Sequence, residues 1–118
     1  MDSFREVVRY EVFTEAARLI RAGWVQGKLA VNAQGRQVYF GDESAVAFDA
    51  LGAIERAAGD MAHSERAQAE HYLNGLTLTE FNDSATGSEH VAAFLEFMAV
   101  APYHNPYPVK CGPYEKCT

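Results

Sequence analysis

The chain has 118 residues, of which 48% are hydrophobic and 22% are charged. That length suits one domain with its own core, so neither disulfides nor a metal is needed to hold it together. The net charge is −6 and the basic residues are scattered singly, which disfavours direct binding to DNA or RNA. No apolar run approaches the roughly 18 residues that a membrane span needs, and the N-terminus is polar and acidic, unlike a secretory signal. We therefore expect a cytoplasmic protein that does not enter a membrane.

The first predicted helix spans residues 3–22. Ser3 and Glu6 have the spacing of a capping box, and Gly23 is a stop signal. Apolar side chains recur at helical spacing while charged ones take the other face, which predicts an amphipathic helix lying on a core. The apolar stripe consists of Phe4, Val8, Val12, Ala16, Leu19 and Ile20.

Residues 28–40 have the period of a β-hairpin. Leu29 and Val31, and then Val38 and Phe40, alternate with other residues on either side of a polar turn. Gly35 in that turn can adopt a positive φ. An isolated pair of strands is only marginally stable in water, so we expect the hairpin to pack on the helices.

A second helix is expected over residues 44–58, after the acidic and hydroxyl caps of residues 41–44. Most of its side chains are small, and Gly52 lies in its interior. Glycine costs a helix about 1 kcal/mol relative to alanine, so Gly52 predicts the close approach of another element. A second copy of the chain, docking on the Gly52 face as a homodimer, is one candidate for that element.

The later elements are shorter. Residues 63–74 form a third, polar helix closed by Gly75, and residues 76–81 alternate like a short strand or an extended approach. Residues 82–84 have the composition of a turn. Thr86 and Glu89 then have capping-box spacing and open a fourth helix that runs through Met98 and ends before Pro102. The fold class is therefore α+β and helix-dominated, with about four helices packed with a small two-stranded antiparallel hairpin.

The last residues differ in composition from the rest, so we expect a globular domain over residues 1–101 and a Pro/Tyr-rich arm or tail over residues 102–118. Tyrosines cover apolar surface while keeping a hydroxyl in water, so those of the tail are candidate binding residues. The two cysteines are interpreted as reduced thiols. Zinc binding is a weaker alternative because the spacing matches no standard zinc motif, and no metal or cofactor is predicted. The tyrosines are Tyr103, Tyr107 and Tyr114, and the weak zinc set is His104, Cys111 and Cys117, with His90 as an additional ligand.

Two polar motifs stand at predicted helix ends, Trp24 with Gln26 in one and Asn82 with Asp83 in the other. In a structural interpretation, Asn82 and Asp83 form an Asx-type turn that satisfies backbone N–H groups, and Gln26 ties down the loop after the first helix. In a functional interpretation the four residues and His90 surround a site. The structural interpretation is favoured because no spacing requires a nucleophile and a base to converge.

The motif order resembles a family of small uncharacterised proteins found in bacteria and their phages. The matching positions are Trp24, Gln26 and Gly27 for a Trp-x-Gln-Gly motif, residues 50–53 for Ala-Leu-Gly-Ala, and residues 82–83 for Asn-Asp. The resemblance implies that Asp49 and Val25 stand where family members often carry cysteines, and that Phe81 replaces a tryptophan. It supports the expected fold and carries no established activity.

We therefore expect a non-enzymatic protein-binding accessory factor, encoded by a phage or prophage, that inhibits or modulates a bacterial host protein or defence system. A small acidic domain without a complete catalytic motif motivates this expectation. The alternative is a small hydrolase or ligand-binding enzyme with a polar site around Trp24, Gln26, Asn82, Asp83 and His90.

Overall fold

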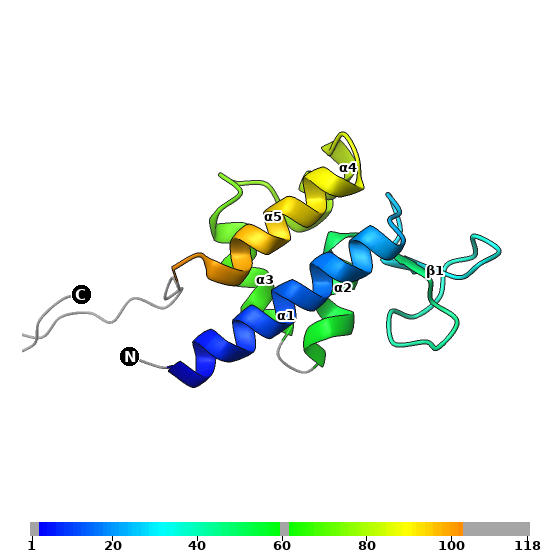
Figure 1. Ribbon diagram of the computed structural model, residues 1–118. Helices are drawn as coiled ribbons and strands as arrows, with labels where there is room; N and C mark the ends of the chain where they lie inside the picture. The colour runs from blue at the N-terminus through cyan, green and yellow to red at the C-terminus, as the bar shows by residue number, and fades with distance from the viewer. Residues whose placement is uncertain (1–2, 60–61, 103–118) are drawn as a thin grey trace, which may run out of the picture.

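The computed structural model describes residues 3–59 and 62–102. Within these residues the chain forms five α-helices and one two-stranded antiparallel sheet. The helix-dominated α+β class is therefore confirmed, but there are five helices and not about four. Helix α1 (Ser3–Ala22) runs antiparallel to α5 (Ser88–Val100), with α2 (Ala50–Ala58) and α3 (Ala62–His71) behind this pair and the sheet at one end (Figure 1).

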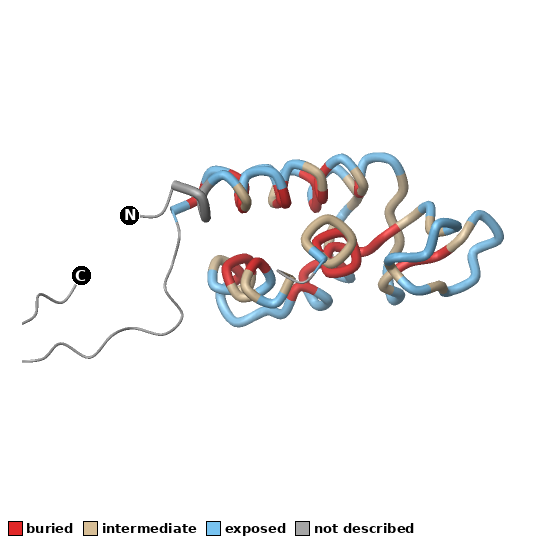
Figure 2. The backbone as a smooth tube through the Cα atoms, turned by 90° about the horizontal axis from the view of Figure 1, so that it is seen from below, coloured by how far each residue is buried: buried red, intermediate tan, exposed pale blue. Residues whose placement is uncertain are grey.

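Helix α1 matches its predicted bounds, and its buried residues lie on the side that faces the other helices (Figure 2). It packs chiefly against α5 and α2. Burial of each large apolar side chain stabilises a fold by about 1.5–3 kcal/mol, so these helix contacts supply most of the stabilisation. The largest fully buried apolar side chains of the core are Phe13, Ile20, Ile54, Leu78, Val91, Leu95 and Met98.

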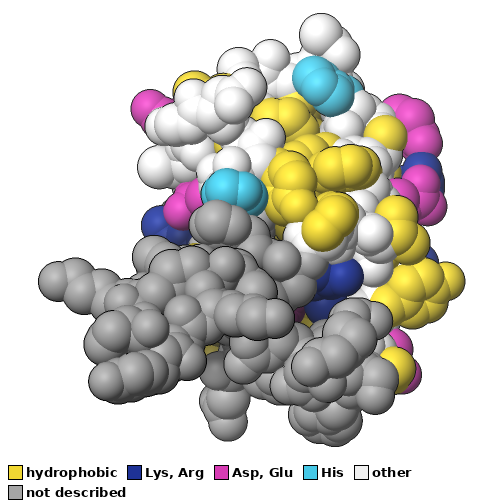
Figure 3. All heavy atoms as spheres, turned by 90° about the vertical axis from the view of Figure 1, so that its left-hand side faces the viewer, with side chains coloured by type: hydrophobic (Ala, Val, Ile, Leu, Met, Phe, Trp, Pro, Cys, Tyr) yellow, Lys and Arg dark blue, Asp and Glu magenta, His cyan; other side chains and the backbone are white. Residues whose placement is uncertain are grey.

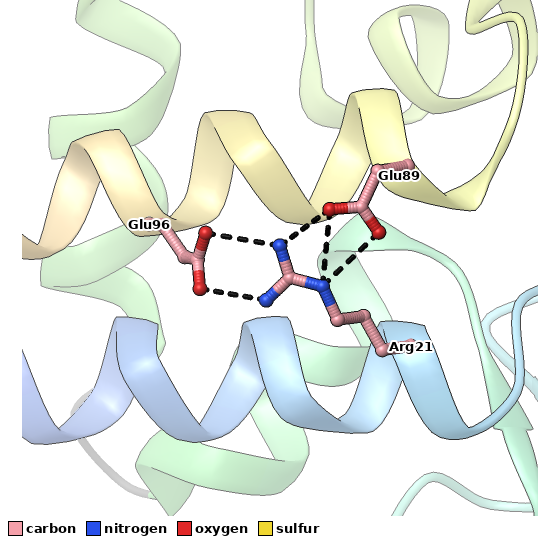
Figure 4. A network of polar contacts seen from close by, with 3 residues as sticks. All are labelled: Arg21, Glu89 and Glu96. Carbon is pink, nitrogen blue, oxygen red and sulfur yellow. Dashed lines mark hydrogen bonds and ion pairs between the residues drawn. The ribbon is translucent and has the colours of Figure 1, made fainter.

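Arg21 joins α1 to α5 on the surface. Its guanidinium lies between two carboxylates of α5, with Nη2 2.6 Å from Glu89 Oε1 and Nη1 2.6 Å from Glu96 Oε2 (Figure 4). Hydrogen bonds from Arg21 lower the pKa of both carboxyl groups. Because Glu89 and Glu96 lie two turns apart, the bridge favours one register of the antiparallel pair.

The predicted hairpin is only partly correct. The turn forms, with Gly35 at φ +79° and the Val38 N–H donating to the Ala30 carbonyl. The predicted strand pairing is reduced to an isolated antiparallel bridge between Val31 and Gln37, and the strand that pairs with β1 (Ala30–Val31) is β2 (Ala47–Phe48). The chain turns away after Val38 because Arg56 Nη1 binds the carbonyls of Phe40 and Asp42, which holds residues 39–45 as a loop.

The second helix begins at Ala50, six residues later than predicted. Asp49 is its N-cap, and its Oδ1 accepts a hydrogen bond from the Gly52 N–H. Asp42 caps no helix, because its Oδ1 accepts from the backbone and hydroxyl of Ser44 in a turn. The helix ends at Ala58, the predicted last residue, and Gly59 follows as its C-cap at φ +58°.

The largest correction concerns residues 76–84. They form helix α4 (Leu78–Ser84) and not a strand followed by a turn. Thr77 and Glu80 make a complete capping box: the Thr77 side chain accepts from the Glu80 N–H, and the Glu80 side chain accepts from the Thr77 N–H. The capping box satisfies two backbone N–H groups at the start of the helix. This stabilisation exceeds the weak preference for a strand that comes from the alternation of Leu76 and Leu78.

Two helix ends also differ from the prediction. Helix α3 ends at His71, before a series of turns that reaches Gly75. Helix α5 starts after Gly87 without a side-chain cap, so Thr86 and Glu89 do not form the expected capping box. Its end at Val100 agrees with the stop expected before Pro102.

Candidate functional site at the junction of the Trp24 loop, α2 and α4

The loop after α1 lies against the sheet. The Phe48 N–H donates to the Gly23 carbonyl at 3.0 Å, and the Val25 N–H donates to the Phe48 carbonyl at 3.1 Å. A Cβ on Gly23 would stand 2.2 Å from the Val46 carbonyl oxygen, so only glycine permits this approach. The pairing directs the half-buried indole of Trp24 toward α4.

Asn82 is the centre of the junction and is fully buried. Its Oδ1 accepts from Trp24 Nε1 at 2.7 Å and from the Ala50 N–H at 2.9 Å. Its Nδ2 donates to the Val25 carbonyl at 3.0 Å and contacts Asp83 Oδ1 at 3.4 Å. The amide therefore uses both acceptor positions and both donors, and it joins the Trp24 loop and the start of α2 to α4.

Gln26 and Asp83 extend the junction to the surface. Gln26 Nε2 donates to the carbonyls of Asn82 and Asp83, at 3.1 and 3.0 Å. In return, Asp83 Oδ1 accepts from the Gly27 N–H at 3.1 Å, where Gly27 has a φ of +81°. Gln26 thus binds two carbonyls of the last turn of α4, of which the Asn82 carbonyl also accepts from the Ala85 N–H at 3.3 Å.

Asp49 lies beside this junction and is only 2% exposed. Burial raises the pKa of its carboxyl group to about 6, and the nearby charges of Asp83 and Glu55 act in the same direction. The hydrogen bond from the Gly52 N–H opposes these effects. Asp49 occupies the position at which the family resemblance implies a cysteine, and here it serves as a helix cap.

Four of the predicted site residues meet in this junction: Trp24, Gln26, Asn82 and Asp83. The predicted Asx-type turn is wrong, because Asn82 and Asp83 lie in the last turn of α4 and their side chains reach the Trp24 loop and α2. His90 packs edge-on against the Phe81 ring, with centroids 5.4 Å apart.

The polar side chains of the junction hold the Trp24 loop, the start of α2 and the end of α4 together. The side chains of Asn82 and Gln26 bind backbone groups, which leaves few polar atoms to act on a substrate. Three hollows in the described part of the chain lie elsewhere, beside α2 and α3, along α3, and beside Tyr39. The largest of the three has a volume of about 390 Å³ and is lined by Leu29 and residues 37–40.

The face of α2 at Gly52, which was a candidate homodimer face, is covered by residue 29 of the same chain. A Cβ on Gly52 would stand 2.0 Å from the Leu29 carbonyl oxygen. The close approach that the glycine predicted is therefore real, and the segment leading into β1 makes it.

A row of aromatic side chains between α3 and α5, with one further ring from α4, was not predicted from the sequence. Successive ring centroids are 4.8–6.4 Å apart. We call this set the aromatic row; in order, it consists of His71, Tyr72, Phe97, Phe94, Phe81 and His90. The spacing of Phe94 and Phe97 was the one available signal, but nothing in the sequence places Tyr72 against them.

The aromatic row is partly exposed. Phe81 is buried and Phe94 is half-buried, while Phe97 is 47% exposed. Val100, one turn beyond Phe97, is 70% exposed. Hydrophobic side chains gather, with histidines beside them, on the side of the molecule that shows the end of α5 (Figure 3). This surface is the second candidate site.

In residues 3–59 and 62–102, no three His, Cys, Asp or Glu side chains form a group that could hold a metal. His104, Cys111, Cys117 and the tail tyrosines Tyr103, Tyr107 and Tyr114 lie outside the described residues. No helix in the described part of the chain is both long and apolar enough to cross a membrane.

Comparison with known proteins supports the family assignment. Neither the curated proteins nor the solved structures that were searched gave a match. A family model matches residues 7–101, a range that contains the Trp24 loop, α2, α4 and the aromatic row. The chain belongs to the family of unknown function DUF6197.

Proposed function

We propose that this protein is a non-enzymatic protein-binding factor that docks on a bacterial host protein through the aromatic row and inhibits or modulates it. The partly exposed rings of Tyr72, Phe94 and Phe97 carry the proposal. The resemblance to bacterial and phage proteins supports a phage- or prophage-encoded accessory factor that acts in the cytoplasm of the host cell.

Aromatic side chains are well suited to this role. Each ring buries a large area and loses little conformational entropy, and tyrosine and phenylalanine are enriched in protein interfaces. Ring-to-ring contacts already hold Phe97 between Tyr72 and Phe94. A partner would therefore meet a surface whose side chains are ordered before binding, which lowers the entropic cost of association.

The test is affinity capture from bacterial lysate with three baits: the unchanged chain, Phe97→Ser, and Tyr39→Ser as the matched control. Tyr39 is 67% exposed in the loop between β1 and β2. We expect one protein to be captured by the unchanged chain and by the control but not by Phe97→Ser. Calorimetry with the purified partner should show at least tenfold weaker binding to Phe97→Ser. Equal capture by all three baits, or capture by none, contradicts the proposal.

The small-hydrolase alternative is favoured by one observation, the pair Asp49 and Asp83. A buried carboxyl with a raised pKa near an exposed carboxylate resembles an acid–base pair. This alternative predicts that the protein hydrolyses activated ester or phosphate substrates and that Asp49→Asn abolishes the activity. Equal rates for the two proteins would eliminate it.

A further inference from the structure

The sheet has one covered edge and one open edge. At β2, the Phe48 N–H donates to the Gly23 carbonyl and the Phe48 carbonyl accepts from the Val25 N–H, so the Trp24 loop covers this edge. At β1, the returning arm of the turn, residues 36–38, is the outermost segment. The chain between β1 and β2 projects away from the helices (Figure 1).

The backbone of Gln37 points away from the sheet. Gln37 lies opposite Val31 in an antiparallel bridge. The Val38 N–H and the Asn32 N–H make the hydrogen bonds on either side of this pair, at 3.0 and 2.9 Å. The pair itself is therefore not hydrogen-bonded, and the Gln37 N–H and carbonyl face outward. Within residues 3–59 and 62–102, these two groups and the Tyr39 N–H take part in no hydrogen bond.

A hollow adjoins this open edge. Its volume is about 390 Å³, and it is lined by Leu29 and residues 37–40. The rings of Tyr39 and Phe40 lie with their centroids 4.3 Å apart, and Arg56 Nη1 holds the Phe40 carbonyl at 2.9 Å. An apolar side chain of a bound segment can therefore pack in the hollow while the backbone of that segment pairs with the edge.

An extended peptide matches both features. A strand beside Gln37 accepts from its N–H and donates to its carbonyl, and alternate side chains of that strand point to one face. A helical segment cannot do this, because its backbone groups are bonded within the helix. A second copy of the chain fits less well. Residues 36–40 span only about 17 Å, and two such edges bury far less than the roughly 1,000 Å² of a specific dimer.

We propose that the open edge at Gln37 binds an extended peptide segment of another protein, which adds a strand to the sheet and places an apolar side chain in the hollow. Proline often blocks a sheet edge, but all four prolines of this chain come after residue 101. The edge is separate from the aromatic row, and the inference does not rest on the proposed function.

The probe is a capped heptapeptide in which leucine and threonine alternate between terminal lysines, titrated into the nitrogen-15-labelled full chain. We expect the amide proton resonances of Gln37 and Tyr39 to move downfield and hydrogen exchange of the Gln37 N–H to slow at least tenfold at saturation. Two further peptides carry N-methyl groups on either the leucines or the threonines. Only one set of peptide amides faces the edge, so one methylated peptide should bind at least tenfold more weakly than the other.

Two variants test the backbone of the edge. Gln37→Pro removes the outward N–H, and Gln37→Ala is the matched control because it removes the side chain and keeps this donor. We expect Gln37→Ala to bind the peptide within twofold of the unchanged chain and Gln37→Pro to bind at least tenfold more weakly. The comparison of the methylated peptides uses the unchanged chain, so it decides the matter even if the proline disrupts the turn.

Absence of binding at millimolar peptide, binding that leaves the Gln37 and Tyr39 amides unmoved, or equal binding of the two methylated peptides overturns the inference. Sedimentation identifies the other occupant: a dimer that Gln37→Pro dissociates would place a second copy at the edge and would also overturn it. Phe97→Ser should bind the peptide as the unchanged chain does, so loss of partner capture and loss of peptide binding are separate outcomes.

Discussion

The indole Nε1 of Trp24 donates a 2.7 Å hydrogen bond to Oδ1 of Asn82, joining two residues 58 positions apart in the chain. The same oxygen accepts from the Ala50 N–H, so one atom connects the Trp24 loop and α4 to the start of α2. An asparagine can do this because its amide both accepts and donates, and Nδ2 holds the Val25 carbonyl at the same time.

Asn82→Ala should destabilise the protein by about 2–4 kcal/mol. The substitution leaves the Trp24 indole, the Ala50 N–H and the Val25 carbonyl without their partner, and buried polar groups that lose a partner are costly. Urea denaturation followed by circular dichroism measures the change. The control is Asn74→Gly, an exposed position in a turn whose φ of 51° glycine adopts without strain. Equal unfolding free energies for the two variants would contradict the central role of Asn82.

Gly52→Ala should lower the free energy of unfolding by about 2 kcal/mol or more, although alanine is the better helix former. The new Cβ would stand 2.0 Å from the Leu29 carbonyl oxygen, so the backbone must move. Gly87→Ala is the matched control, because nothing lies within 4 Å of its added Cβ and its φ of 172° is open to any residue. Thermal unfolding of both variants checks the prediction, and a neutral Gly52→Ala would show that α2 does not pack closely on residue 29.

Asp49 should make stability depend on pH. Its pKa is about 6 in the folded protein, against an ordinary value of 3.8 for an aspartate, so the folded state binds the proton more tightly than the unfolded state. The stabilisation from the protonated carboxyl is complete below about pH 4 and is lost as the pH rises through 6. One pKa unit corresponds to about 1.4 kcal/mol, so the whole effect is at most about 3 kcal/mol.

The Asp49→Asn variant is the reference for this measurement, since its side chain can still cap α2 but does not titrate. The unfolding free energy of the unchanged chain, relative to this variant, should fall between pH 4 and pH 7. A carbon-13 titration of the Asp49 carboxyl should give a midpoint near 6. A midpoint near 4 would show that the carboxyl is solvated.

Arg21→Gln should lower the urea midpoint slightly, and more at low salt than in 1 M NaCl. The pairs with Glu89 and Glu96 are solvent-exposed, and salt screens such pairs. Arg18→Gln is the control, because Arg18 pairs only with Glu15 of its own helix among the described residues. Salt-independent destabilisation by Arg21→Gln would mean that its stem, not its charge, stabilises the contact of α1 with α5.

Sequence patterns predicted the elements whose stabilisation is local or strongly periodic. The apolar stripe of α1 recurs along the helix, and α2 ends at Ala58, the predicted last residue. The prediction was wrong at α4. Leucines at alternate positions were interpreted as a strand, although the capping box of Thr77 and Glu80 starts a helix there. The prediction also failed at β2, because the choice of a strand partner depends on distant contacts such as those of Arg56.

For this protein, the sequence alone determined the helix-rich class, the family and the small residues that permit close packing, since these depend on composition and local spacing. The tertiary structure decided what the conspicuous residues contact. It joined Trp24 and Gln26 to Asn82 and Asp83, gave Asp49 the role of a helix cap, and assembled the aromatic row from three helices. The physical reason is that each of these contacts links distant positions, and only the packing of the helices brings such positions within hydrogen-bond or ring-contact distance.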